Sequence, residues 1–423
     1  MNTATGEHTL VSVSDEAGGT TRFANNQVSQ NVHIRRQSLS VSAAFGRRHG
    51  RASTTELTDA GIRAVVAAAE ELARVAPEDP EYLPPLGSQN YPRLASHRPE
   101  TAAVGPGGRI ERVKLAVEAC REAGMQAAGA MEAYAGSVGI AAAGGLFAFE
   151  SRTRSQFTIT ATASDSSGWA GDASRSVDDL DVAALAQRAI EKARRSASPT
   201  ELPPGRYTVL LEPAAVSGLV GPLLSAMDAR SYHRGTSALR GRLDERIVDS
   251  RLTLRNRPDH PSLLGGGFNG EGLSADYHAW IEAGVLRRLA YDRFTAQEHG
   301  QAPSGELDAP LLEGSAAEAL ESLEELIATT KRGVLVTNFW YIRPVNATDL
   351  TLTGMTRDGL FLVEDGRIGP GLLNFRWHDS PLRALDAIDG YTRPLDAVSW
   401  ERDKMLLPAL RVGDFHFSSV TRF

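Results

Sequence analysis

Two neighbouring segments near the C-terminus carry the residues best suited to binding chemistry. Thr337-Asn-Phe-Trp-Tyr-Ile-Arg343 and Thr353-Gly-Met-Thr-Arg-Asp-Gly359 combine strand-forming aromatic and aliphatic residues with Asn, Arg and Asp. Arg343 and Arg357 are close in sequence, and a guanidinium group can bind a carboxylate through two parallel hydrogen bonds. The arginines therefore either bind the carboxylate of a ligand or pair with Asp358 to stabilise a turn. The residues alone leave both alternatives open.

A metal or serine-hydrolase motif is not recognisable in the sequence. A zinc-peptidase helix carries two His on one face and a Glu that activates water. The ten histidines are scattered, and no His-Glu pair is followed by a nearby His. There is also no Gly-x-Ser-x-Gly elbow. The histidines are therefore expected at the surface or in hydrogen bonds, unless folding brings several of them together around an ion.

Two other polar segments are each open to more than one interpretation. Gly265-Gly-Gly-Phe-Asn-Gly-Glu-Gly272 is rich in glycine like a phosphate-binding loop, but it lacks the Lys-Ser/Thr pair and no helix pattern follows it. We expect a flexible loop near a site. Arg22-Phe-Ala-Asn-Asn-Gln27 offers three carboxamides that suit either a grip on a peptide backbone or a turn, because Asn tolerates left-handed conformations.

Composition excludes several classes of function. The 423 residues are 42% hydrophobic and 23% charged, as in ordinary globular proteins, and suffice for two or three domains. The net charge of -7 argues against a general nucleic-acid binder. Cys120 is the only cysteine, so we expect a buried thiol in a reducing compartment. Without a signal pattern in Met1–Leu10 or a long apolar stretch, the sequence predicts a cytoplasmic protein.

The pattern of strands and helices predicts an α+β protein of two domains. An N-terminal α+β domain, 1–200, contains two strand-helix blocks of about 8–76 and 109–197, joined by a connection rich in Pro and Gly. Pro203-Pro204-Gly205 marks the boundary, and a mainly β domain follows over 205–423. The similar order of elements in the two blocks indicates a shared architecture.

Within these domains, local signals predict individual elements. Thr58 caps a helix over 59–75, and a second helix begins at Pro213 and contains Pro222. A further helix is expected over 316–331. Turns are expected at Gly18-Gly19-Thr20 and at the polar stretch 164–173.

Four of these segments, taken in order, resemble the TldD/PmbA (TldE) family. They are Arg22–Gln30, Gly284–Ala296, Thr337–Arg343 and Thr353–Gly359, and the resemblance spans nearly the whole chain. Members of this family are cytosolic metallopeptidase subunits linked to the removal of leader peptides and to the degradation of unfolded peptides. The resemblance implies an α+β N-terminal domain, a mainly β C-terminal domain, and dimers that surround an enclosed cavity.

The resemblance also implies which kind of subunit this is. TldD-type subunits carry a His-Glu-x-x-x-His metal helix and a Cys ligand near the C-terminus, whereas TldE-type subunits lack them. In this chain Gly221, Pro222 and Ala226 stand at the positions of the two His and the Glu, and Cys120 is far from the C-terminus. The chain therefore resembles the TldE (PmbA) type. Phe268-Asn-Gly-Glu-Gly272 also departs from the acidic run expected in TldD-type subunits.

The function that the resemblance implies is that of a non-metal subunit in a heterodimeric cytosolic peptidase. This chain would position an unfolded or leader peptide, and a TldD-type partner would supply zinc, so no catalytic residue and no cofactor is assigned here. Two alternatives are a stand-alone homodimeric peptide-binding protein and a biosynthetic enzyme of another class that reuses the cavity. Arg22 and Asn25 are expected nearer a domain or dimer interface, and the expected cavity wall comprises Asn338, Trp340, Arg343, Arg357 and Asp358.

The degenerate metal helix leads to a prediction about the isolated chain. Because Gly221, Pro222 and Ala226 offer no ligand atoms, the purified protein should carry no stoichiometric zinc and should cleave no unfolded peptide. Elemental analysis and a casein-fragment assay, each with and without a chelator, measure both. Tightly bound metal together with chelator-sensitive cleavage would contradict the assignment.

Overall fold

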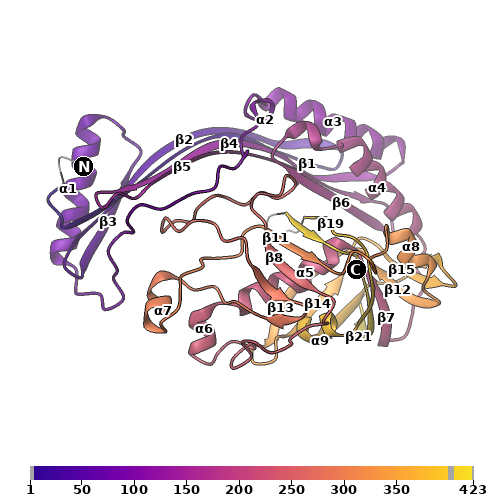
Figure 1. Ribbon diagram of the computed structural model, residues 1–423. Coiled ribbons are helices and arrows are strands. Elements are labelled where there is room, and N and C mark those ends of the chain that lie inside the picture. The colour runs from indigo at the N-terminus through magenta and orange to yellow at the C-terminus, as the bar shows by residue number, and fades with distance from the viewer. Residues whose placement is uncertain (1–3, 399–403, 422–423) are drawn as a thin grey trace.

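A six-stranded antiparallel sheet of unusually long strands forms one layer of the molecule. The computed structural model describes residues 4–398 and 404–421. The strands run in the order β3-β2-β1-β4-β5-β6, and the sheet arches over the C-terminal half (Figure 1). Its strands are β1 (His8–Ala24), β2 (Gln27–Phe45), β3 (Arg48–Thr54), β4 (Gln126–Ala142), β5 (Phe147–Thr162) and β6 (Ser167–Ser174).

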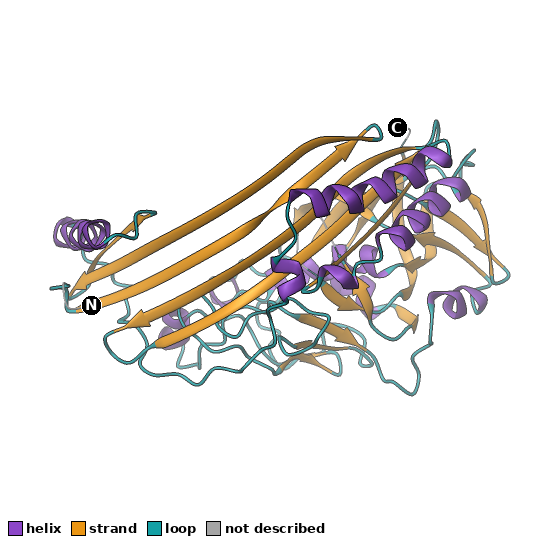
Figure 2. Ribbon diagram, turned by 90° about the horizontal axis from the view of Figure 1, so that it is seen from above, coloured by secondary structure: helices purple, strands orange, loops and turns teal. Residues whose placement is uncertain are grey.

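The helices of this half cover the two ends of the sheet. α1 (Asp59–Val75) packs on β2 and β3, and α4 (Val182–Arg195) packs on β5 and β6. α3 (Pro106–Glu122) lies beside α4 on the outer face (Figure 2), while α2 (Pro99–Ala102) and the 3₁₀ turn η1 (Val177–Asp179) are short. Each block therefore contributes three strands and a closing helix, and the two sets meet at the pair β1–β4. In the second block the residues expected to form two strands over 145–163 form the single strand β5.

Local signals predicted the first helix correctly but two turns wrongly. α1 spans the predicted residues, and the Thr58 hydroxyl accepts a hydrogen bond from the Gly61 N–H at 3.1 Å. Gly18 and Gly19 lie within β1 instead of at a turn. A Cβ on Gly19 would lie 1.9 Å from the Val32 carbonyl oxygen. Glycine there permits close approach of neighbouring strands.

The polar stretch predicted as a turn over 164–173 forms strand β6 instead. A Cβ on Gly168 would lie 2.1 Å from the Ala189 carbonyl oxygen of α4. The small residues of β6 therefore let α4 approach the sheet, and no local signal distinguishes this role from that of a turn.

The C-terminal half is built from two further sheets. The smaller sheet has the order β10-β9-β8-β11-β20-β19, and its strands are β8 (Thr253–Asn256), β9 (Ala279–Glu282), β10 (Val285–Leu286), β11 (Pro310–Glu313), β19 (Leu395–Ala397) and β20 (Met405–Leu407). The larger sheet has the order β13-β14-β17-β21-β7-β12-β15-β16, and β18 pairs with β21. This architecture confirms the predicted α+β class.

The larger sheet includes the segments that were expected to carry chemistry. Its strands are β7 (Gly205–Leu211), β12 (Arg332–Val336), β13 (Phe339–Asn346), β14 (Thr351–Thr356), β15 (Leu360–Glu364), β16 (Arg367–Gly371), β17 (Phe375–Asp379), β18 (Ile388–Tyr391) and β21 (Leu410–Val420). β12 pairs with β7 in parallel and with β15 in antiparallel orientation. β13 is the end strand of this sheet.

Helix α5 (Pro213–Ala226) occupies the centre of the C-terminal half and contacts both sheets. Val216, Leu219, Val220 and Leu223 are each at most 1% exposed. Burying such a side chain contributes roughly 1.5–3 kcal/mol, so α5 is firmly held. The other helices are short: α6 (Ala229–His233), α7 (Arg293–Glu298), α8 (Leu323–Ala328) and α9 (Pro381–Asp386). Among residues 4–398 and 404–421 no helix combines the length and apolar character needed to cross a bilayer.

The helix predicted over 316–331 is reduced to the six residues of α8. The Leu320 N–H donates to the Tyr391 carbonyl oxygen at 2.9 Å, and Leu320 forms a parallel bridge with Thr392. Pairing with a distant strand therefore replaces the first turns of the helix. Helix propensity is a weak preference that such tertiary contacts override.

Two polar contacts fasten the arched sheet to the C-terminal half. The Lys192 ammonium of α4 lies 2.6 Å from the Glu212 carboxylate, which immediately precedes α5. The Ser167 hydroxyl of β6 donates to Asp358 Oδ1 at 2.8 Å. The start of α5 and the turn between β14 and β15 are thus both positioned by the N-terminal half.

The only cysteine provides a test of the packing of α3. Cys120 is fully buried, as predicted, and burial raises the pKa of its thiol to about 11. The thiolate is the reactive species, so the native protein should react with a disulfide reagent at pH 8 at least about a hundredfold more slowly than the unfolded chain. In urea one thiol per chain should react rapidly. Fast labelling of the native protein would contradict the buried position.

Candidate functional site

Helix α5 and strand β13 form opposite walls of a cavity of about 660 Å³. The segment after α6 and the turn from β13 to β14 complete its lining. Six residues singled out by their sequence line this one cavity: Asn338, Trp340, Arg343, Gly221, Pro222 and Ala226. Folding therefore brings helix α5 and the polar strand segment together, although more than a hundred residues separate them in the chain.

A bulge in β13 shapes the wall opposite α5. Trp340 pairs with Met355 and Arg343 with Thr353, so β13 contains one residue more than β14 over this stretch. Tyr341 takes up the extra length with a positive φ of 53°. A bulky residue with φ in this region is strained, and bulges turn side chains to new directions beside functional sites. The local strain is evidence that the cavity wall has a specific shape.

Asn338 contributes an uncommitted hydrogen-bond donor to this cavity. Its side chain is only 5% exposed, yet its Nδ2 atom has no hydrogen-bond partner within the described chain. The main chain around it is fixed, because its carbonyl oxygen accepts from the Arg357 N–H at 3.2 Å. A buried polar group without a partner costs about 1–3 kcal/mol. A ligand with an acceptor atom would remove this cost.

The two arginines predicted together occupy different environments. Arg343 is exposed at the cavity, lies over the Tyr341 ring at 4.4 Å and donates to the Ile342 carbonyl oxygen at 2.7 Å. Arg357 lies over the Trp340 ring at 4.8 Å, and its Nε is 3.6 Å from Asp358 Oδ2. The ion pair considered from the sequence is thus present for Arg357. Neither Arg357 nor Asp358 is among the residues that line this cavity.

Asp358 is buried between the two halves of the molecule. Its side chain is 4% exposed and accepts the Ser167 hydrogen bond described above. The Thr337 hydroxyl lies 3.0 Å from the carbonyl oxygens of Asp358 and Gly359, which fixes the turn. Burial raises the pKa of the Asp358 carboxyl, although Ser167 and Arg357 act in the opposite direction. Asp358 therefore links β6 of the N-terminal half to the β14–β15 turn of the C-terminal half. It lies outside the cavity and helps to hold the wall of the cavity in place.

Arg22 and Asn25 lie at the end of the long sheet and do not line the cavity. Asn25 and Asn26 form the β1–β2 turn with φ of 51° and 58°. The Asn26 side chain donates to the Met125 carbonyl oxygen at 2.9 Å and accepts from the Ala127 N–H at 2.7 Å. Of the two sequence interpretations, a turn is what Asn25 and Asn26 form, and the Asn26 carboxamide stabilises it.

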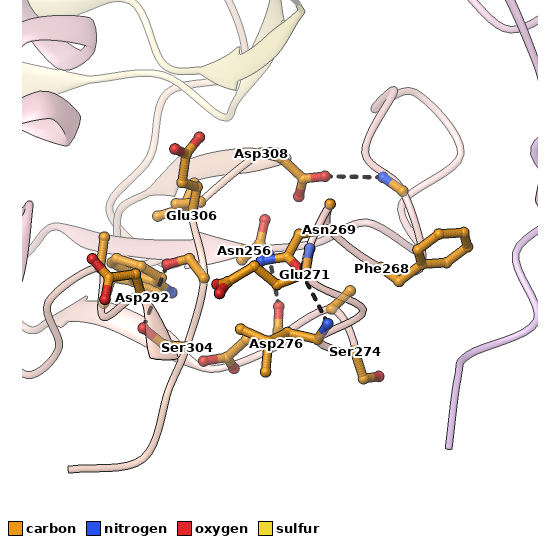
Figure 3. Close-up of a pocket in the computed structure, with 18 of the residues that line it drawn as sticks. Asn256, Phe268, Asn269, Glu271, Ser274, Asp276, Asp292, Ser304, Glu306 and Asp308 are labelled. Atoms are coloured by element: carbon orange, nitrogen blue, oxygen red, sulfur yellow. Dashed lines mark hydrogen bonds between the residues drawn. The ribbon is translucent and has the colours of Figure 1, made fainter. Parts of the chain in front are cut away.

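A second cavity of about 610 Å³ lies beyond the C-terminal end of α5. The glycine-rich loop forms part of its wall, together with β9 and residues 304–308 (Figure 3). Ser225 lines both cavities. Six carboxylates line the second one: Asp228, Glu271, Asp276, Asp292, Glu306 and Asp308. Sequence reasoning missed this cluster because its members are dispersed over about eighty residues without a common spacing.

The glycine-rich loop is held by the N-terminal half. The Arg175 guanidinium donates to the Gly265 carbonyl oxygen at 2.7 Å. The Gly267 N–H donates to Glu150 at 2.9 Å, and the Tyr91 hydroxyl donates to the Gly272 carbonyl oxygen at 2.7 Å. The loop lies at a cavity, as expected, and these contacts anchor both of its ends and its centre.

The side chains of the metal-helix positions do not fit zinc. Gly221, Pro222 and Ala226 have no nitrogen, oxygen or sulfur in their side chains that could bind the ion. Among residues 4–398 and 404–421, no three His, Cys, Asp or Glu side chains come together in a group that could hold a metal ion. No chemical step at this site is therefore assigned to a metal in this chain.

Asp358 offers a test of its burial through the pH dependence of stability. Asp358→Asn keeps an acceptor for the Ser167 hydroxyl and removes a charge that burial disfavours. Because the folded-state pKa is raised above the unfolded value of about 3.9, the parent protein loses stability as pH rises through these two values. The variant should become more stable relative to the parent from about pH 4 upwards, measured by urea unfolding at several pH values. A loss of stability in the variant that grows as pH rises would instead assign the main role to the pair with Arg357.

Comparisons with known proteins agree with this architecture. Models of the PmbA/TldA metallopeptidase family match residues 11–73 (domain 1), 100–197 (central domain) and 204–419 (C-terminal domain). The structure is similar to that of TldE from Thermococcus kodakarensis, with a TM-score of 0.89, 18% identity, and coverage of 98% of this chain and 97% of that chain. A putative modulator of a DNA gyrase from Thermotoga maritima gives a TM-score of 0.87 at 18% identity, covering 97% and 96% of the two chains.

Curated sequences give a partial match. A protein named metalloprotease from Methanothermobacter thermautotrophicus is 26% identical over 223 residues, which are 50% of this chain and 48% of that protein. A metalloprotease from Archaeoglobus fulgidus is 28% identical over 115 residues, covering 26% and 27%. The aligned region thus spans at most about half the length of these relatives. The family models together cover most of the chain, and it belongs to the PmbA/TldD family of metallopeptidase-related proteins.

Proposed function

We propose that this chain is the non-metal subunit of a heterodimeric cytoplasmic peptidase. It holds an unfolded or leader peptide, and a TldD-type partner supplies zinc and the general base. The observation that carries this proposal is the composition of the first cavity. Its α5 wall presents Gly221, Pro222 and Ala226, which cannot ligate a metal, while its β13 wall presents polar and aromatic side chains. Such a cavity is suited to binding, and no His, Cys, Asp or Glu is among its lining residues in the described chain.

Strand β13 is suited to the main chain of a peptide. It is the end strand of the larger sheet in the described part of the chain, so one side of its backbone faces away from other strands. An extended peptide can add to such an edge through main-chain hydrogen bonds. The Asn338 Nδ2 atom supplies a further donor for a peptide carbonyl oxygen.

Aromatic and basic side chains at the same wall extend the contact surface. Trp340 and Tyr341 line the cavity, and Arg343 lies at its exposed side. A guanidinium group there attracts carboxylates of a peptide, and the aromatic rings offer apolar surface to its side chains. Arg357 and Asp358 act behind this wall by holding Trp340 and the β14–β15 turn in place.

Asn338→Ala tests this assignment in the assembled enzyme. The chain is co-expressed with a TldD-type partner, and peptide cleavage by the pair is compared with cleavage by each subunit alone. Cleavage should require both subunits, and the variant should raise KM for the peptide several-fold, up to about tenfold, because one hydrogen bond to the substrate is lost. Asn90→Ala, at an exposed residue outside both cavities, is the matched control and should leave KM unchanged.

The same experiment distinguishes the two alternatives. A homodimer that binds peptide, with an affinity that Asn338→Ala reduces but with no partner-dependent cleavage, would support a stand-alone binding protein. If the chain neither binds nor cleaves a peptide, with or without the partner, the proposal is overturned. An enzyme of another class is then the remaining alternative.

A further inference from the structure

The second cavity is strongly acidic and has a role that the first cavity does not explain. Six carboxylates line it, and no Lys or Arg is among the lining residues (Figure 3). Its other lining side chains are small, polar or apolar, and they include Asn256, Phe268 and Trp280. The wall therefore concentrates negative charge around a space large enough for part of a ligand.

Two of the carboxylates already have cationic neighbours. Asp276 lies 2.8 Å from an Arg288 nitrogen and also contacts His278. Asp292 lies 3.5 Å from Arg230 and caps α7 through the Thr295 N–H. These two side chains are accounted for by the architecture.

Of the other four carboxylates, Asp228 caps α6 through the Ser231 N–H, and three form no ion pair in the described chain. Glu271, Glu306 and Asp308 take part in no ion pair within the residues that the structure describes. Burial raises the pKa of Glu271 and Asp308, although the charges of Arg293 and Arg152, which lie outside the wall, act in the opposite direction. A cation inside the cavity would stabilise these carboxylates in their charged form.

Trp280 gives an independent sign that a ligand belongs in this cavity. Its side chain is 1% exposed and belongs to the cavity lining, but its Nε1 atom has no acceptor in the described chain. A buried indole N–H normally has a hydrogen-bond partner. The carboxylates require a positively charged donor, whereas Trp280 requires an acceptor. A protonated amine or guanidinium with a nearby carbonyl oxygen satisfies both.

A bare metal ion meets these conditions less well. The carboxylates of the cavity do not converge in the described structure into a group of three that could hold a metal ion. A metal would also leave the Trp280 N–H without an acceptor. An organic cation can reach separated carboxylates through several N–H groups and carry its own carbonyl oxygen.

The two cavities lie on either side of the C-terminal end of α5. Ser225 lines both of them, and Gly221 and Pro222 line the first while Leu224 lines the second. One extended peptide can therefore contribute groups to both. We propose that the second cavity binds a cationic group of the peptide whose main chain lies along β13, and this proposal rests on the function proposed above.

The cationic group has two possible sources in a peptide. The α-ammonium group of the first residue lies next to its own carbonyl oxygen, whereas a Lys or Arg side chain carries its charge at a greater distance from the main chain. Both offer charged donors to Glu271, Glu306 and Asp308, and both can bring a carbonyl oxygen to Trp280. The chemistry that recognises them is the same, so an experiment must separate them.

The indole N–H resonance of Trp280 reports on the cavity without the partner subunit. The chain has five tryptophans, so the spectrum is simple, and Trp280→Phe assigns the resonance. The isolated full-length chain is titrated with glycinamide, which has only an α-ammonium group, and with Nα-acetyl-lysinamide, which has only a side-chain ammonium group. N-acetylglycinamide is the neutral control.

The expected result is a saturable shift of this resonance with at least one cationic probe and none with the neutral probe. A response to glycinamide alone identifies a subsite for the peptide N-terminus, and a response to Nα-acetyl-lysinamide alone identifies a subsite for a basic side chain. Glu271→Gln should weaken binding of the active probe about tenfold, because a charged hydrogen bond is lost. Glu364→Gln, at an exposed residue that pairs with Arg332, should leave it unchanged.

Two results would overturn this inference. One is that neither cationic probe shifts the Trp280 resonance. The other is that Zn²⁺ or Mg²⁺, added without an organic cation, shifts it. Because the titration needs neither the partner nor cleavage, its failure is separate from failure of the proposed function, which the Asn338→Ala kinetics measure.

Discussion

Close contact between α5 and β13 is the constraint on which the rest of the site depends. A Cβ on Gly218 would lie 2.7 Å from Ile342 Cδ1 and 3.5 Å from the Phe339 Cβ, so glycine lets the strand lie directly against the helix. The apolar side chains around α5 are packed into the core on its other sides. The helix therefore cannot move away, and the strand adapts to it through a bulge and a strained tyrosine. The first cavity is the space that this arrangement leaves open.

The N-terminal half contributes to the site by positioning these walls. Glu212, at the start of α5, pairs with Lys192 of α4, and both side chains are largely buried. Desolvation offsets much of the attraction in such a pair, so its clear consequence here is the fixed position of the start of α5 against α4. The glycine-rich loop is fastened by Arg175 and Glu150 from the same half. Both cavities thus depend on contact between the arched sheet and the C-terminal sheets.

The two cavities differ in charge on either side of a neutral helix. The first has an arginine and an amide donor in its wall, whereas the second has six carboxylates. The helix end between them carries Gly, Pro, Leu, Ser and Ala, so it separates the two environments without adding charge. A peptide that spans both would be bound in one direction only, because its acceptors and its cation meet different walls.

Much of the architecture follows from local signals in the sequence. The cap at Thr58 defined α1, and the Pro-Pro-Gly segment preceded β7. The missing ligands at Gly221, Pro222 and Ala226 could also be recognised without a structure, because they are a matter of residue type. The polar residues of the Thr337–Arg343 segment could be recognised from residue type in the same way. Local signals failed where tertiary contacts took over. This happened at β6 and in the residues just before α8, which were expected to be helical.

The sequence by itself determined the α+β class, the family resemblance and the absence of metal ligands on α5. Only the tertiary structure decided that Asn338 and Arg343 lie opposite α5, that Asp358 joins the two layers, and that the acidic cavity exists. The physical reason is that residue type and periodicity act within a few turns of the chain. A cavity instead collects side chains from distant strands and loops, whose separation depends on how whole layers pack.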